Sequence, residues 1–166
     1  EDNMKVAIVT GASRGIGRAC AIRLAQDGYT VVVNYAHSDT EAQKVLDTIR
    51  ENGGDGMLYR ADVSKVEEVR AMMRDVSKAY GQIDVLVNNA GIVKDEYLLM
   101  LTPETLDKCM ELNVKGYLYC AQQAVLKMVR KKSGVIINMS SVSGILALPG
   151  QCVYSATKGA VNSMTQ

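Results

Sequence analysis

The chain has 166 residues, of which 48% are hydrophobic and 22% are charged, and this is enough for one domain with a buried core. Its formal net charge of +1 gives no reason to expect nucleic acid or an anionic membrane as a partner. The four cysteines form no CxxC pair and His37 is the only histidine, so we expect no metal site.

Short apolar runs alternate with longer amphipathic stretches along the whole chain. In chain order they predict strands at 6–10, 30–35, 56–61, 84–89 and 134–140, and helices near 16–27, 40–52, 66–80, 103–131 and 154–166. The strand runs are continuously apolar, as expected when helices cover both faces of a parallel sheet. Thr102 and Pro103 suit the N-cap and first turn of the fourth helix.

This alternation predicts a single α/β domain over residues 1–166, a Rossmann-type doubly wound parallel sheet in a three-layer αβα arrangement. The usual form of this fold has six strands, and the sequence predicts five. We therefore expect the C-terminal strands to be missing, with the helix that begins near residue 154 continuing in a longer polypeptide. No run approaches a membrane span of roughly 18 apolar residues, and the N-terminus lacks the pattern of a secretion signal, which favours a cytoplasmic location.

A glycine-rich turn, TGASRGIG at residues 10–17, joins the first strand to the first helix. Glycine lets the backbone approach a pyrophosphate, and the helix N-terminus offers free N–H groups and a positive dipole end. The spacing differs from the G-x-G-x-x-G pattern of many dinucleotide sites. We expect a dinucleotide to contact Gly11, Ser13, Gly15, Ile16 and Gly17, and an ordinary glycine turn is the alternative.

The end of the second strand bears on which dinucleotide binds. NAD sites typically place an acidic residue there for the ribose 2′-hydroxyl, whereas this chain has Asn34. Arg14, inside the glycine turn, could pair with a 2′-phosphate through its guanidinium group. NADP(H) is therefore favoured over NAD, unless Arg14 is only a solvated surface charge. His37 is expected on a surface loop.

The segment YSATK at residues 154–158 follows the fifth predicted strand. If a helix begins there, Tyr154 and Lys158 lie on one face and can point at the same ligand. A phenol ordinarily ionises near pH 10, and an adjacent ammonium group stabilises its phenolate form. Such a pair suits acid–base catalysis near neutral pH.

Taken together, these segments resemble the short-chain dehydrogenase/reductase family, and within it the bacterial 3-oxoacyl-(acyl-carrier-protein) reductases. The motifs occur in order as TGxxxGxG at 10–17, DV at 62–63, NNAG at 88–91, Asn113 in ELNVKG, Ser141, and YSATK at 154–158. The resemblance implies that Tyr154 gives a proton to a substrate carbonyl oxygen and that Lys158 assists it and binds the nicotinamide ribose. It implies that Ser141 holds the carbonyl, with Ser140 and Ser143 as weaker candidates, and that Asn113 fixes a water. It further implies cofactor contacts from Asp62, Val63, Asn89, Ala90 and Gly91.

The activity implied by this resemblance is NADPH-dependent reduction of 3-oxoacyl-(acyl-carrier-protein) to the 3-hydroxyacyl form in fatty acid synthesis. DEYLLM at 95–100 and GQ at 150–151 favour this branch. The basic run 127–132 could dock an acidic carrier protein, or it could merely stabilise a helix C-terminus. The family implies a homotetramer through the helices near 103–131 and 154 onward. The alternatives are a steroid, sugar or small ketone as substrate, and a cofactor-binding module without turnover.

Overall fold

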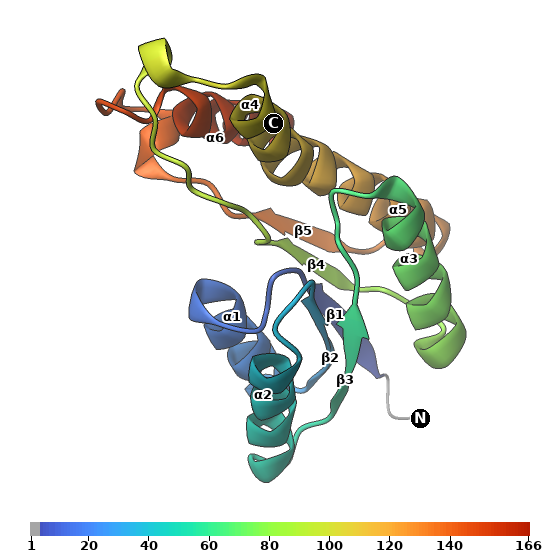
Figure 1. The fold of residues 1–166 in the computed structure, drawn as a ribbon. Coiled ribbons are helices and arrows are strands. Elements are labelled where there is room, and N and C mark those ends of the chain that lie inside the picture. The colour runs from blue at the N-terminus through green and yellow to red at the C-terminus, as the bar shows by residue number, and fades with distance from the viewer. Residues whose placement is uncertain (1–3) are drawn as a thin grey trace.

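The computed structural model describes residues 4–166 as a five-stranded parallel sheet with helices on both faces (Figure 1). Residues 1–3, on which the prediction about a secretion signal partly rests, lie outside the described residues. The strand order is β3-β2-β1-β4-β5, so the predicted Rossmann-type sheet is confirmed. The strands are β1 (Lys5–Val9), β2 (Tyr29–Tyr35), β3 (Gly56–Arg60), β4 (Val85–Asn88) and β5 (Val135–Asn138).

Alternate residues of the strands enter two separate hydrophobic clusters, one on each face of the sheet. Val6 and Ile8 of β1 join the cluster beneath α3 (Val66–Tyr80) and α5 (Gly116–Lys131). Ala7 and Val9 join the cluster beneath α1 (Gly15–Gln26) and α2 (Asp39–Glu51). Both faces of the central strands are thus buried, which explains their continuous apolar sequence. Within residues 4–166, no helix has the length and apolar character that a membrane crossing requires.

The helix predicted over 103–131 is present, and it contains a π-helical turn that the sequence did not reveal. The structure has α4 (Pro103–Met110), a π-helical turn η2 (Glu111–Lys115) and then α5. Asn113 lies in this turn with its carboxamide paired to the backbone of Ile92: Oδ1 accepts from the Ile92 N–H and Nδ2 donates to the Ile92 C=O, each at 2.8 Å. π-Helical turns within helices are frequent at functional sites. The hydrophobic period runs through this turn and does not reveal it.

The last elements bring the fifth strand and the last helix together. After β5 come a 3-10 turn η3 (Val142–Gly144) and α6 (Cys152–Met164), which begins two positions before the predicted residue 154. At Gly144 the chain passes so close to α6 that a Cβ atom would lie 2.8 Å from the backbone carbon of Lys158. A second 3-10 turn, η1 (Leu98–Met100), precedes α4. The loops after β4 and β5 meet where the Glu96 N–H donates to the Gly150 C=O at 2.8 Å.

Candidate active site

The glycine turn brings the amino end of α1 to the carboxyl ends of β1 and β4. A Cβ atom at Gly17 would lie 2.3 Å from the Gly11 carbonyl oxygen and 2.5 Å from Asn89 Nδ2, so no side chain fits there. Asn89 Nδ2 donates to the carbonyl oxygens of Thr10 and Gly11, at 3.2 and 3.1 Å. Asn89 thus fastens the loop after β4 to the turn after β1, and both of these hydrogen bonds come from its side-chain NH₂ group.

The first turn of α1 offers backbone groups to an anion. Arg14 occupies the N-cap position and its side chain makes no capping hydrogen bond, so the side chain does not occupy the N–H groups of the first turn. Backbone N–H groups at a helix N-terminus bind phosphates well. Arg14 is exposed beside them, as are Gly15 and Ile16.

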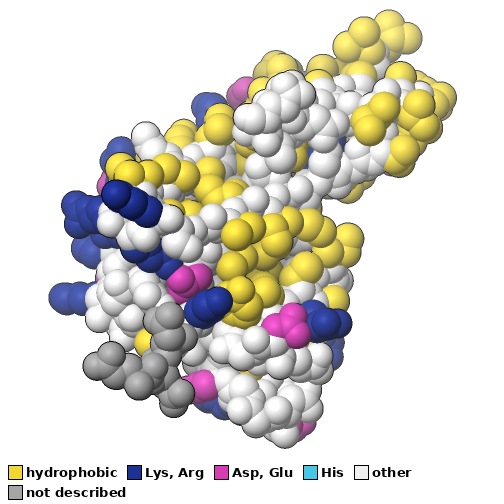
Figure 2. All heavy atoms as spheres, turned by 180° about the vertical axis from the view of Figure 1, so that it is seen from behind, with side chains coloured by type: hydrophobic (Ala, Val, Ile, Leu, Met, Phe, Trp, Pro, Cys, Tyr) yellow, Lys and Arg dark blue, Asp and Glu magenta, His cyan; other side chains and the backbone are white. Residues whose placement is uncertain are grey.

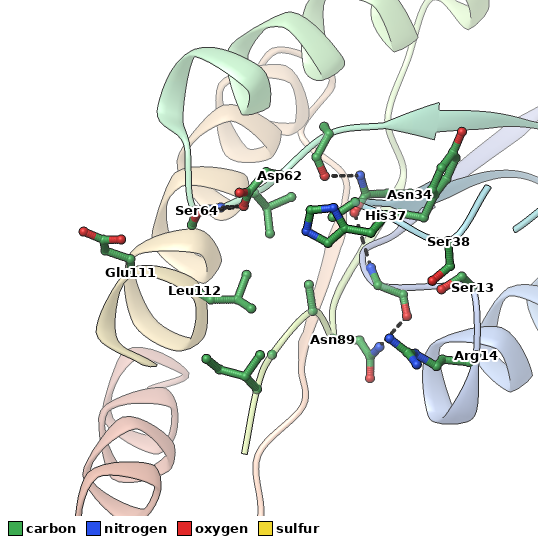
Figure 3. A pocket seen from close by; sticks show the side chains of 18 of the residues that line it. Ser13, Arg14, Asn34, His37, Ser38, Asp62, Ser64, Asn89, Glu111 and Leu112 are labelled. Carbon is green, nitrogen blue, oxygen red and sulfur yellow. Dashed lines mark hydrogen bonds between the residues drawn. The ribbon is translucent and has the colours of Figure 1, made fainter. Parts of the chain in front are cut away.

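A cavity of about 510 Å³ opens beside this turn, where the carboxyl ends of the central strands meet (Figure 3). Open α/β sheets bind their ligands at this edge. The residues predicted to contact a cofactor that line the cavity are Gly11, Ser13, Arg14, Asn34, Asp62, Val63, Asn89, Ala90 and Gly91. Gly15, Ile16 and Gly17 lie in the adjoining α1 turn and do not line the cavity.

Asn34 has a structural task that the sequence does not reveal. Its Oδ1 accepts from the Gly11 N–H at 3.3 Å, and its Nδ2 donates to the carbonyl oxygens of Tyr59 and Ala61 at 3.2 Å. Asn34 is buried and joins the ends of β1, β2 and β3. Because both hydrogens of its amide are already donated, Asn34 contributes to the cavity wall but has no N–H left for a ligand.

Several residues that line the cavity were not predicted as site residues. His37 is exposed, as predicted, and Figure 3 shows its ring pointing into the cavity from the loop after β2. On the facing wall, Asp62 Oδ1 accepts from the N–H and the hydroxyl of Ser64, at 3.0 and 2.6 Å. The signal that could have found His37 is its place directly after a strand whose carboxyl end faces the cleft. The other unpredicted lining residues are Tyr35, Ala36, Ser38, Ala61, Ser64, Ile92, Lys108, Glu111 and Leu112.

The four residues predicted to be catalytic lie outside this cavity, around η2, η3 and α6. Lys158 is 5% exposed, and its Nζ lies 5.8 Å from the centroid of the Tyr154 ring. Nζ donates to the Met139 carbonyl oxygen at 2.7 Å and to the Tyr117 hydroxyl at 3.2 Å. Burial lowers the pKa of Lys158 from its usual value. The phenol of Tyr154 is partly exposed, whereas the ammonium group beside it is enclosed.

Ser141 and Asn113 lie on neighbouring elements, Ser141 directly before η3 and Asn113 within η2. Ser141 Oγ accepts from the Ser143 N–H at 3.1 Å, so its own hydrogen is available for another acceptor. The hydroxyl groups of Ser140 and Ser143, by contrast, donate to Asn162 and Gln151, at 2.6 and 2.7 Å. Asn113 is fully buried and contacts α6 through Nδ2, which donates to the Thr157 hydroxyl at 3.3 Å.

The strand order, the glycine turn and the cavity at the carboxyl ends of the strands define a Rossmann-type α/β domain. The sequence model of the short chain dehydrogenase family matches residues 5–166, and the chain therefore belongs to this family.

Comparisons with single proteins agree with this family. The chain is 46% identical over 162 residues to a 3-oxoacyl-[acyl-carrier-protein] reductase FabG of Staphylococcus aureus (strain N315), covering 98% of this chain and 66% of that protein. A 3-oxoacyl-[acyl-carrier-protein] reductase of Synechocystis sp. is 44% identical, with the same coverage. A crystal structure from Sinorhizobium meliloti 1021, assigned as a short-chain alcohol dehydrogenase, superposes with a TM-score of 0.93 at 30% identity and covers 97% of this chain and 64% of that one. The chain thus spans about 66% of the length of these curated relatives.

Proposed function

We propose that the protein is an NADPH-dependent oxidoreductase that reduces the 3-oxo group of a 3-oxoacyl thioester, most specifically 3-oxoacyl-(acyl-carrier-protein) in fatty acid synthesis, to the 3-hydroxyl group. The observation that carries this proposal is the enclosed Lys158 ammonium group 5.8 Å from the centroid of the partly exposed Tyr154 ring. The relatives at 44–46% identity, named 3-oxoacyl-[acyl-carrier-protein] reductases, support the substrate class. A cytoplasmic location is part of the proposal.

The residues at the glycine turn fit a dinucleotide. A side chain at Gly17 would collide with the Gly11 carbonyl, so glycine permits the close packing of α1 against this turn. The first N–H groups of α1 would then bind the pyrophosphate. Arg14 would pair with the 2′-phosphate of NADPH, and Asn34 stands near the end of β2, where NAD sites typically place a carboxylate for the 2′-hydroxyl. When bound, the reduced nicotinamide supplies the hydride that the carbonyl carbon accepts.

The protein's own side chains would supply the proton that the carbonyl oxygen accepts. Tyr154 donates its hydroxyl proton to the carbonyl oxygen, and the Lys158 ammonium group stabilises the phenolate that remains. Ser141 donates a hydrogen bond to the same oxygen. Tyr154 is reprotonated through Lys158 and a water at Asn113. Both hydrogens of the Asn113 amide are donated to Ile92 and Thr157, so this water would bind an oxygen of Asn113.

The basic end of α5 supports an acidic carrier protein as the partner. Lys127, Arg130 and Lys132 lie there, while Lys131 pairs with Asp84. An acidic surface would be attracted to these cations over about 10 Å at ordinary salt. The same cations also stabilise the C-terminus of α5, which fits either role.

We further propose that the protein assembles as a homotetramer through α5 and α6. Leu118, Val125 and Val129 are exposed on α5 at spacings that place them on one helical face. Contiguous exposed apolar side chains of this kind mark interaction surfaces. The measurement that checks this is the mass of the full-length protein in solution by light scattering, and a monomer at micromolar concentration would contradict it.

The test of the function is NADPH oxidation by the full-length protein with an acetoacetyl thioester, in the wild type and in Tyr154→Phe. Loss of the general acid is expected to lower turnover by about 10²–10⁴-fold, while NADPH binding, followed by fluorescence, is retained. Tyr29→Phe, a partly buried tyrosine at the opposite end of the sheet, is the matched control.

Three outcomes would distinguish the proposed function from its alternatives. Equal turnover in Tyr154→Phe and the wild type would rule out Tyr154 as the proton donor. NADPH binding without turnover of any carbonyl would leave a cofactor-binding module. Faster turnover of free ketones than of thioesters would move the substrate to another branch of the family.

A further inference from the structure

A second phenol lies against the Lys158 ammonium group. Tyr117, on α5, is 1% exposed, and its hydroxyl donates to the Met139 carbonyl oxygen at 3.0 Å while accepting from Lys158 Nζ at 3.2 Å. Nζ also donates to Met139 at 2.7 Å. It lies 5.0 Å from the centroid of the Tyr117 ring and 5.8 Å from that of Tyr154. The ammonium group is therefore held between two aromatic rings at the end of β5.

A buried ammonium group is stable only if acceptors replace the water that it has lost. Here the acceptors are the Met139 carbonyl and the Tyr117 hydroxyl, and the faces of aromatic rings attract a cation as well. Within residues 4–166, the titratable groups that lie next to Lys158 Nζ are two phenols, Tyr117 from α5 and Tyr154 from α6. No carboxylate of the described residues pairs with Lys158, so the charged form depends on these neutral contacts.

The two phenols differ in a way that separates their tasks. Burial, and to a smaller degree the proximity of Tyr154, raises the pKa of Tyr117 well above the usual range of tyrosine. Tyr117 consequently stays neutral, and its hydroxyl is already engaged as donor and acceptor. Tyr154 is partly exposed at the same ammonium group.

We propose that Tyr117 is a positioning residue for the reaction, whose hydroxyl and ring hold Lys158 in its charged form beside Tyr154. This inference rests on the proposed carbonyl reduction. A phenylalanine would fill the same apolar space, so the hydroxyl is the part of Tyr117 that the inference explains. Asn88 Nδ2 donates to the Tyr117 carbonyl oxygen at 3.1 Å and to Asn138 Oδ1 at 3.0 Å, which fixes this turn of α5 against β4 and β5.

The test is Tyr117→Phe, assayed in the oxidative direction with a 3-hydroxyacyl thioester and NADP⁺. In this direction Tyr154 must lose its proton, and a charged Lys158 favours that loss. Removing one acceptor disfavours the ammonium form, so the rising limb of kcat/KM against pH should move to higher pH by about one unit. KM for the thioester should change by less than about twofold, because the Tyr117 side chain is enclosed and presents no surface to the substrate.

Tyr119→Phe is the matched control, because Tyr119 is a partly buried tyrosine two positions along the same helix. Its pH profile should coincide with that of the wild type. A second readout needs no turnover: NMR titration of lysines labelled at Cε should find that the pKa of Lys158 falls further in Tyr117→Phe.

The outcomes separate this inference from the proposed function. If Tyr154→Phe abolishes turnover while Tyr117→Phe keeps the wild-type pH limb and Lys158 titration, only the role of Tyr117 is overturned. A uniform loss of activity at every pH, with the limb in place, would show Tyr117 to be structural and would also overturn the inference. If Tyr154→Phe turns over normally, the proposed function itself fails.

Discussion

The two sides of the cleft are built differently. Beside β1, β2 and β3, short loops are held by side-chain amides: the buried Asn34 bonds to backbone groups at the ends of all three strands, and the partly buried Asn89 reaches across from the loop after β4 to the turn after β1. Beside β4 and β5, longer loops carry apolar side chains into solvent, among them Leu99 at 98% and Ile145 at 80% exposure. Figure 2 shows hydrophobic side chains gathered at this end of the molecule, at the upper right of that view.

This difference matches the two ligands proposed for the cleft. A dinucleotide is polar and always of the same size, so a cavity of about 510 Å³ with hydrogen-bonded walls suits it. An acyl chain is apolar and variable in length, so an exposed apolar surface suits it better. Between the two sides stands Lys158, whose Nζ bonds to Tyr117 on α5 and to Met139 beyond β5.

Gly17→Val should give the largest effect on the nucleotide side. Its Cβ would lie 2.3 Å from the Gly11 carbonyl oxygen, which is backbone, and 2.5 Å from Asn89 Nδ2, which is hydrogen-bonded to the turn. Overpacking of this kind costs about 1–3 kcal/mol of folding free energy, and we expect NADPH binding to be lost with it. Thermal melting and fluorescence titration measure the two effects. Ala19→Val, exposed on the same helix, is the control, and wild-type NADPH affinity in Gly17→Val would contradict the placement of the pyrophosphate.

Arg14→Gln should have a smaller and more selective effect. The guanidinium group is exposed at the amino end of α1, and a charge-assisted pair with a 2′-phosphate should raise NADPH affinity about tenfold. We therefore expect the dissociation constant of NADPH to rise by about that factor while that of NADH stays unchanged. Arg18→Gln, exposed on the same helix, serves as the control. An equal loss of affinity for both dinucleotides would mean that Arg14 does not read the 2′-position.

Leu99→Ser should have the smallest effect, confined to the substrate side. The side chain is 98% exposed, so the free energy of unfolding should change by less than about 0.5 kcal/mol. If this surface carries the acyl chain, KM should rise about threefold for a long-chain thioester and stay constant for acetoacetyl. Lys94→Ser, exposed on the same loop, is the control. A KM that is insensitive to chain length would place the acyl chain elsewhere.

The sequence predicted best where local chemistry decides the structure. The continuous strands, the glycine turn and the Thr102 cap each follow from residues within a few positions of one another, and the structure has all three. The π-helical turn at Glu111–Lys115 has no local sequence signal, and the side-chain contacts of Asn113 within it are with Ile92, 21 positions away. The role of Tyr117 was not predicted either, because its contacts with Met139 and Lys158 span 22 and 41 positions of the sequence.

The most direct test of the central claim is a crystal structure of the full-length protein with NADP⁺ and a 3-oxoacyl thioester. The account predicts that the 3-oxo oxygen lies within hydrogen-bond distance of the Tyr154 and Ser141 hydroxyl groups, with the Lys158 ammonium group beside the Tyr154 ring. A carbonyl bound away from Tyr154, or a Lys158 side chain turned out to solvent in that complex, would contradict it.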